Sequence, residues 1–286
     1  MSQTQKERVL RAAPGRNRSL IIPREHGAWG ILLVPLLTAA SVGLLAGGGG
    51  GSLLPFILVA LSLFWLRTPV ESWIGTAPIR ARTPGEIQLV QAAVIWLATV
   101  AIAGLIWLFW EGRNRALIWI GCAAGSAFLV QSFLRWIWRS ARAAAQMVGA
   151  VGLTSTAAAA YYVVTGRLDT TAWSLWAANL LFAINQIQFV QRRIHAARTD
   201  NRGPKLAIGR GFLVGQALLV TLILAACATG IFRWYAAMAF LPVLIRGFAW
   251  FGAKPKPLTV HSLGKSELVH ACVFGLLVVI GMQLLP

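Results

Sequence analysis

Long apolar blocks separated by short polar connections dominate this sequence. A helix needs about 20 mostly apolar residues to cross the hydrocarbon core of a bilayer. The apolar runs are continuous and do not alternate, which predicts helices rather than the strands of a membrane barrel. We therefore expect an all-α, polytopic membrane bundle of nine transmembrane helices. The nine blocks are 27–46, 52–66, 87–109, 116–134, 143–164, 172–191, 208–229, 231–251 and 267–285.

Composition excludes several classes of protein. Of the 286 residues, 57% are AVILMFWYC and only 12% are charged, whereas about 25% are charged in soluble domains. A soluble enzyme and a disordered chain are therefore excluded. The three cysteines lie inside apolar blocks without CxxC spacing, so neither a zinc site nor a disulfide framework is predicted. The connections leave no room for a soluble domain, and we expect two regions: a basic cytoplasmic tail, 1–22, and a nine-helix transmembrane domain, 23–286.

The net charge of +18 has a topological explanation. Every second connection is basic: the N-terminal segment and the four connections on its side carry six, three, three, six and four Lys or Arg, 22 in all, and the other side carries four. By the positive-inside rule this predicts an inner-membrane protein with its N-terminus in the cytoplasm and its C-terminus on the outer side. The basic side would lie against anionic membrane lipids, and no nucleic-acid partner is expected.

Two groups of polar residues in the first third of the chain are candidates for a binding site. The segment Pro23–Trp29 places Arg24, Glu25 and His26 at the entrance of the first span, where a capped helix start is the structural alternative. The connection after the second block carries Arg80 and Arg82 as candidate ligand-binding residues and Glu71 as a candidate catalytic residue. Its structural alternative is a solvated basic loop.

A polar stripe begins near the end of the sixth block and continues beyond it. Asn185, Gln188, Arg192 and His195 are spaced so that they share one helical face. They could bind a ligand, or the amides could hold two helices together. The stripe runs into a glycine-spaced basic segment, 202–210, which enters the next helix and is a candidate anion cradle. Its candidate ligand-binding residues are Lys205 and Arg210.

The ninth block begins with two ionisable residues, Glu267 and His270, one turn apart. Arg246 lies near the end of the preceding block and could pair with Glu267. The alternatives are a simple contact between helices and a role in ligand binding or proton handling, because ionisable residues inside spans usually mark functional sites. We include Arg246 among the ligand-binding candidates and Glu267 and His270 among the catalytic ones.

Three stretches resemble the YwiC-like family of bacterial integral membrane proteins. The most specific is Pro23-Arg24-Glu25-His26-Gly27-Ala28-Trp29, and the others are 240–246 and 263–270. The family is poorly characterised, so the resemblance implies placement rather than activity.

A more distant resemblance is to the UbiA-type intramembrane prenyltransferases. It rests on the segments 77–83 and 203–210 and implies a UbiA-like bundle of nine helices with a diphosphate site at the inner face. Those enzymes bind Mg²⁺ through two Asp-rich motifs. Here the matching positions hold Glu71 in the first and Asn185, Gln188 and Arg192 in the second, and amides do not replace the carboxylates that Mg²⁺ prefers.

These patterns together favour a cytoplasm-facing basic cavity that binds an anionic or lipid-linked ligand, isoprenoid-like for example, without a metal or a cofactor. Arginine and lysine can hold a phosphate or a carboxylate directly. Two alternatives stay open: a divergent prenyltransferase that uses Glu71, Glu267 or His270, and a transporter of small anions or lipids.

Overall fold

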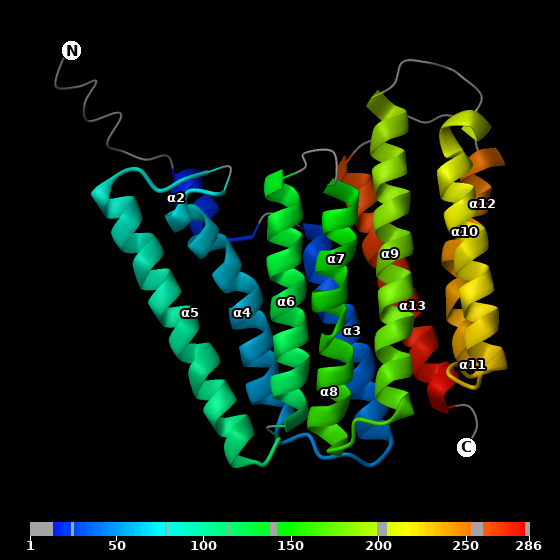
Figure 1. Cartoon of the computed structure of the whole chain (residues 1–286), viewed down its shortest axis with the longest axis horizontal. Helices are drawn as coiled ribbons and strands as arrows, with labels where there is room; N and C mark the ends of the chain where they lie inside the picture. Colours follow the sequence, from blue (N-terminus) through cyan, green and yellow to red (C-terminus); the bar gives the residue numbers. More distant parts are fainter. Residues whose placement is uncertain are drawn as a thin grey trace. The chain divides into compact units, whose positions relative to one another are not determined.

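The computed structural model describes residues 14–23, 26–77, 79–113, 115–137, 142–198, 205–252 and 260–283. The described chain is helical throughout, with short turns between the helices (Figure 1). The helices are α2 (Pro14–Ile21), α3 (His26–Leu45), α4 (Leu53–Ile74), α5 (Pro84–Trp110), α6 (Arg115–Ile137), α7 (Arg142–Thr154), α8 (Thr156–Thr165), α9 (Thr170–Arg198), α10 (Lys205–Ala228), α11 (Trp234–Ala237), the 3-10 turn η2 (Met238–Phe240), α12 (Leu241–Gly252) and α13 (Val260–Gln283).

All nine predicted blocks are helical, and the prediction of an all-α membrane protein is confirmed. Eight helical segments of the described chain are long and apolar enough to cross a membrane. The sixth block, 172–191, lies in the longest helix, α9, which is not among the eight because several amides interrupt its apolar residues. The count of nine spans therefore stays a prediction, as does the UbiA-like arrangement. The eight segments are Gly27–Leu45, Leu53–Ile74, Pro84–Trp110, Arg115–Arg135, Ala143–Thr165, Gly209–Ala228, Trp234–Phe251 and Ser262–Gln283.

The fifth block is interrupted at its middle. α7 ends at Thr154 and α8 begins at Thr156, so one membrane-length segment contains two short helices. Hydroxyl groups account for the break: Thr154 donates to the carbonyl of Ala150 at 2.7 Å, and Thr156 donates to the carbonyl of Leu32 in α3 at 3.2 Å. Such side-chain bonds compete with the helical ladder and bend helices.

The chain divides into two compact units, which are described separately. The first unit contains residues 1–26 and 51–112. In it α4 and α5 pack along each other, and α2 contacts both of them. The close approach of α4 and α5 depends on Gly104, where an added Cβ would lie 2.7 Å from a methyl of Val59 and 3.0 Å from the carbonyl oxygen of Pro55. α2 belongs to the segment expected to be a basic tail, and its Leu20 is fully buried.

The second unit contains residues 27–50 and 113–286. α9 is its central helix, because it contacts α7, α8 and α10 and is hydrogen-bonded to α13. Stacked phenylalanines fill the space between α9 and α13: the ring centroids of Phe182 and Phe274 are 4.2 Å apart, and Phe240 of η2 meets Phe274 at 5.1 Å.

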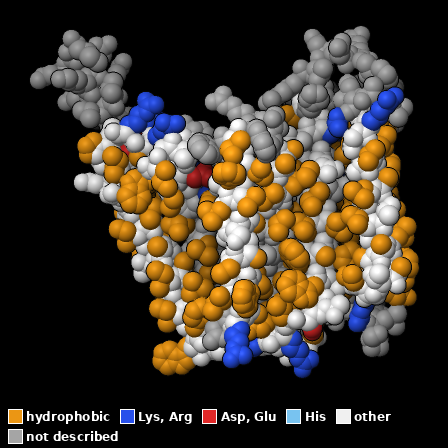
Figure 2. Space-filling model, viewed as in Figure 1, with side chains coloured by type: hydrophobic (Ala, Val, Ile, Leu, Met, Phe, Trp, Pro, Cys, Tyr) orange, Lys and Arg blue, Asp and Glu red, His pale blue; other side chains and the backbone are white. Residues whose placement is uncertain are grey.

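Apolar side chains cover the outward faces of the helices, as a membrane protein requires. Trp96, Trp119 and Ile95 are each more than 60% exposed. Figure 2 shows hydrophobic side chains along the helices and Lys and Arg gathered at helix ends. Exposure of this kind would be unstable in water and is expected where lipid surrounds the protein.

Candidate polar site in the second unit

A buried ion pair joins α12 to α13. The Nη1 atom of Arg246 lies 2.5 Å from Oε2 of Glu267, and the two side chains are 11% and 8% exposed. Each residue lies five positions inside its apolar segment, about 7.5 Å along the helix axis. The pair expected from the sequence is therefore present, and it is buried among helices rather than exposed at the membrane surface.

α9 supplies the third wall of this site. The guanidinium carbon of Arg246 lies 4.1 Å from the ring centroid of Phe189, which is a cation–π contact. One turn earlier on α9, Gln186 donates from Nε2 to the backbone carbonyl of Glu267 at 3.1 Å. Arg193 approaches the same phenylalanine ring at 5.9 Å. Three helices thus fix the position of Arg246.

Several buried polar atoms around this pair have no hydrogen-bond partner among the described residues. They include Nε and Nη2 of Arg246 and Oε1 of Glu267. Gln216 of α10 is fully buried, both atoms of its amide lack a partner in the described chain, and it packs against Gly247. Leaving such a group unpaired costs about 1–3 kcal/mol, and more for a charged group. Buried polar atoms of this kind usually bind water or a ligand.

The predicted polar face of α9 packs against α10. An added Cβ at Gly215 would lie 2.5 Å from Oε1 of Gln188, and one at Gly211 would lie 3.5 Å from Nη2 of Arg192. The two glycines are four residues apart, the spacing that lets helices approach closely in membranes. Asn185, on the same face, is 3% exposed. Gln188 and Arg192 therefore lie against α10, and a role of the stripe in ligand binding stays a prediction.

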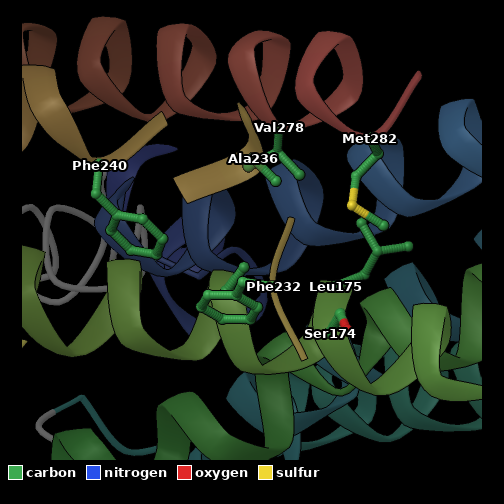
Figure 3. Close-up of a pocket in the computed structure, with 8 residues that line it drawn as sticks. Ser174, Leu175, Phe232, Ala236, Phe240, Val278 and Met282 are labelled. Atoms are coloured by element: carbon green, nitrogen blue, oxygen red, sulfur yellow. The ribbon is translucent and has the colours of Figure 1, made fainter. Parts of the chain in front are cut away.

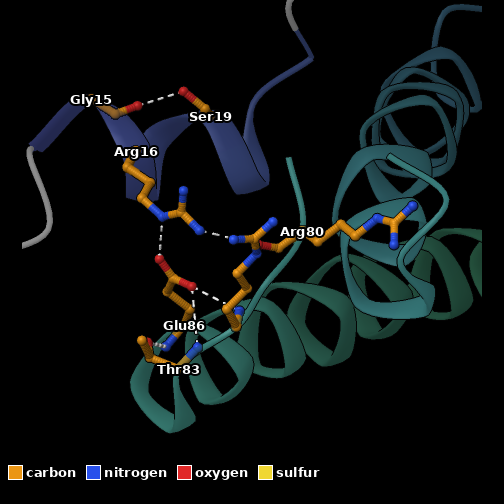
Figure 4. A network of polar contacts seen from close by, with 7 residues as sticks. Gly15, Arg16, Ser19, Arg80, Thr83 and Glu86 are labelled. Carbon is orange, nitrogen blue, oxygen red and sulfur yellow. Dashed lines mark hydrogen bonds and ion pairs between the residues drawn. The ribbon is translucent and has the colours of Figure 1, made fainter. Parts of the chain in front are cut away.

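The first unit contains a separate polar network at the start of α5 (Figure 4). Arg16 of α2 donates from Nε to Oε1 of Glu86 at 2.5 Å, and the other carboxylate oxygen accepts the backbone N–H of Arg82 at 2.8 Å. Thr83 and Glu86 form a capping box, which satisfies N–H groups that a helix start leaves free. The hydrogen bond to Glu86 raises the pKa of Arg16, so this arginine stays charged at any working pH.

The candidates Glu71, Arg80 and Arg82 lie in the same unit. Glu71 accepts from Nε of Arg67, one turn earlier on α4, at 2.9 Å. The backbone of Arg80 accepts from Arg16 at 3.3 Å, and the side chains of Arg80 and Arg82 are exposed. Each of the two candidate catalytic carboxylates, Glu71 and Glu267, therefore forms an ion pair with an arginine.

The remaining candidates are placed as follows. Arg24 and Glu25 lie outside the described residues, as do the side chains of His26, His195 and Lys205. Arg210 is exposed on α10. The ring of His270 lies 2.7 Å, through Nδ1, from the carbonyl oxygen of Ser266. The candidates fall in both units, and their convergence on one cavity stays a prediction.

Two hollows in the second unit are apolar. A small one lies between the first turns of α9 and the end of α13, lined by Ser174, Leu175, Val278 and Met282 among others (Figure 3). An open groove with about 820 Å³ of empty space follows α9 and α10 past Trp176. Both lie toward the end of α9 opposite Arg246. They are not the basic cavity that the sequence led us to expect, which stays a prediction.

Sequence reasoning missed several residues of these sites. Glu86 had a readable signal, because Thr83-Pro84-Gly85-Glu86 has the form of a capping box. Gln216 is the single amide in the apolar run of α10, which also marks it. Phe189 and Arg16 carried no signal, since a phenylalanine in a span and an arginine in a basic segment are ordinary.

Residues 22–162 match the family described as YwiC-like protein. The protein named "Uncharacterized protein YwiC" of Bacillus subtilis (strain 168) is 24% identical over 259 residues, which covers 89% of this chain and 95% of that protein. The predicted resemblance to the YwiC-like family is confirmed. No solved structure matches this chain significantly, and the resemblance to the UbiA-type prenyltransferases stays a prediction.

Proposed function

We propose that this YwiC-like chain is a multi-pass inner-membrane protein that binds an anionic ligand at Arg246. One observation carries the proposal: Arg246 is buried among three helices with two N–H-bearing nitrogens, Nε and Nη2, that have no partner in the described chain. Arginine presents its donors in a rigid fork that suits phosphate and carboxylate oxygens.

The surroundings of Arg246 support ligand binding over a purely structural ion pair. A structural pair is stable in a low-dielectric interior only when hydrogen bonds satisfy its remaining atoms. Here Oε1 of Glu267 also lacks a partner in the described chain. A bound anion would satisfy Arg246, and a hydroxyl or ammonium group on the same ligand would satisfy Glu267.

The distribution of Lys and Arg supports a site that faces the cytoplasm. The side of the membrane on which Arg246 and Glu267 lie carries 22 of the 26 Lys and Arg residues, which is the cytoplasmic side by the positive-inside rule. The ligand would therefore reach the site from the cytoplasm or from the inner leaflet. A free anion and the headgroup of an anionic lipid offer the same oxygen atoms to Arg246.

The experiment measures binding by the full chain in a mild detergent. Titration with sulfate and with inorganic phosphate tests a free anion, and native mass spectrometry after exchange into phosphatidylglycerol tests a lipid headgroup. Arg246→Gln should weaken binding at least about tenfold, since it removes one charged partner. Arg18→Gln, which removes an exposed arginine of α2, is the matched control and should bind like the original chain.

Each result has a distinct meaning. Sulfate or phosphate binding that depends on Arg246 identifies a free anion as the ligand class, and retained phosphatidylglycerol that depends on Arg246 identifies a lipid. If all probes bind equally to the original chain and to Arg246→Gln, or if none binds, the proposal is wrong and water satisfies the buried atoms.

A further inference from the structure

We infer that anion binding at Arg246 is coupled to the uptake of one proton by Glu267. The inference rests on the proposed function and adds a second, chemically linked ligand to the same site. Its basis is the charge of the cluster: one guanidinium and one carboxylate, 2.5 Å apart and both buried.

The cluster is electrically neutral before a ligand binds. An anion on Nε and Nη2 of Arg246 would add a negative charge beside the carboxylate of Glu267. Two negative charges that share one cation in a buried site repel each other, and such a site binds a proton to remove the repulsion. The proton would come from the aqueous phase and bind to a carboxylate oxygen of Glu267, with no bond broken elsewhere.

Protonation also changes the hydrogen-bonding chemistry of Glu267. An ionised carboxylate only accepts hydrogen bonds, whereas a protonated one carries an O–H donor. Its Oε1 atom has no partner among the described residues, so a proton there would give the site a third donor beside Nε and Nη2 of Arg246. Proton and anion therefore favour each other's binding, as linkage requires.

Other charged groups lie on α9 and α13 near Glu267. On α9, Arg193 lies 5.9 Å from the ring of Phe189, and the adjacent Arg192 lies against Gly211 of α10. On α13 itself, His270 lies one turn beyond Glu267. Arg233 binds the carbonyl of Met282 at the other end of α13, too far away to compensate. Arg193 and His270 therefore supply the control variants.

The test measures sulfate affinity of the purified full chain as a function of pH. Sulfate keeps the same charge between about pH 5 and pH 9, so any pH dependence comes from the protein. Over the pH range in which sulfate binding takes up the proton, the affinity for sulfate should fall about tenfold per pH unit, which is the slope for one linked proton. The variant Glu267→Gln carries a neutral side chain of the same shape, so it should bind sulfate tightly and with an affinity that does not change with pH. His270→Gln and Arg193→Gln should keep the original slope.

A second measurement needs no variant. Addition of sulfate to the original chain in weakly buffered solution should take up one proton per bound sulfate. Sulfate binding without proton uptake overturns the coupling and leaves the proposed function intact. The same conclusion follows if the pH dependence of sulfate affinity persists in Glu267→Gln, or if it disappears in Arg193→Gln or His270→Gln. Absence of sulfate, phosphate and phosphatidylglycerol binding overturns both.

Discussion

The buried ion pair between Arg246 and Glu267 allows a quantitative test of the site's structure. Arg246→Leu leaves the carboxylate of Glu267 buried without its cation. Breaking a buried pair in this way costs about 3–5 kcal/mol, and loss of the contact with Phe189 adds about 0.5–2 kcal/mol. Glu267→Leu leaves the arginine unpaired and should cost a similar amount. The double variant removes both charges and should be much less destabilised than the sum of the single variants.

Unfolding by SDS in mixed micelles, followed by circular dichroism, gives the four free energies of this cycle. The control is the pair Arg67 and Glu71 on α4, whose side chains are 18% and 29% exposed and lie one turn apart on a single helix. Removal of that pair should cost less than about 1 kcal/mol. If the effects of the Arg246 and Glu267 variants are additive within about 0.5 kcal/mol, the two side chains do not interact as the structure indicates, and the proposed site is wrong.

Three further predictions concern packing, capping and topology. Gly104→Ala should destabilise the first unit by about 1–3 kcal/mol, because its methyl group would meet α4, whereas Gly121→Ala, with no neighbour within 4 Å, should be neutral or stabilising in the same unfolding assay. Thr83→Ala removes the side-chain cap of α5 and should cost about 1 kcal/mol, measured by thermal unfolding. In a cysteine-free background, Thr76→Cys should react with a membrane-impermeant maleimide only after the membrane is opened, and Gly112→Cys should react in intact cells; the reverse pattern would invert the proposed orientation.

The positions of the helices follow from the sequence because lipid imposes a simple rule. Each span must satisfy its own backbone hydrogen bonds and present apolar side chains over about 20 residues. That rule located all nine helical blocks, and the opening heptapeptide indicated the family resemblance. The capping box at the start of α5 was also readable, since it depends only on residues three apart.

The partners of each polar residue were decided by packing. The spacing of Gln188 and Arg192 predicted a shared face, but only the tertiary structure showed that this face meets the glycines of α10. Conversely, Phe189 gave no signal in the sequence, and its importance comes from the arginine that α12 places over its ring.

The sequence alone therefore determined the class of protein, the helical segments and the family resemblance, because these depend on hydrophobic length and on short local patterns. The pairing of Arg246 with Glu267 was foreseen as one option. Its burial among α9, α12 and α13, and the unpaired atoms that make it a candidate binding site, were decided by the tertiary structure, because burial and hydrogen bonding depend on neighbours that are distant in the chain.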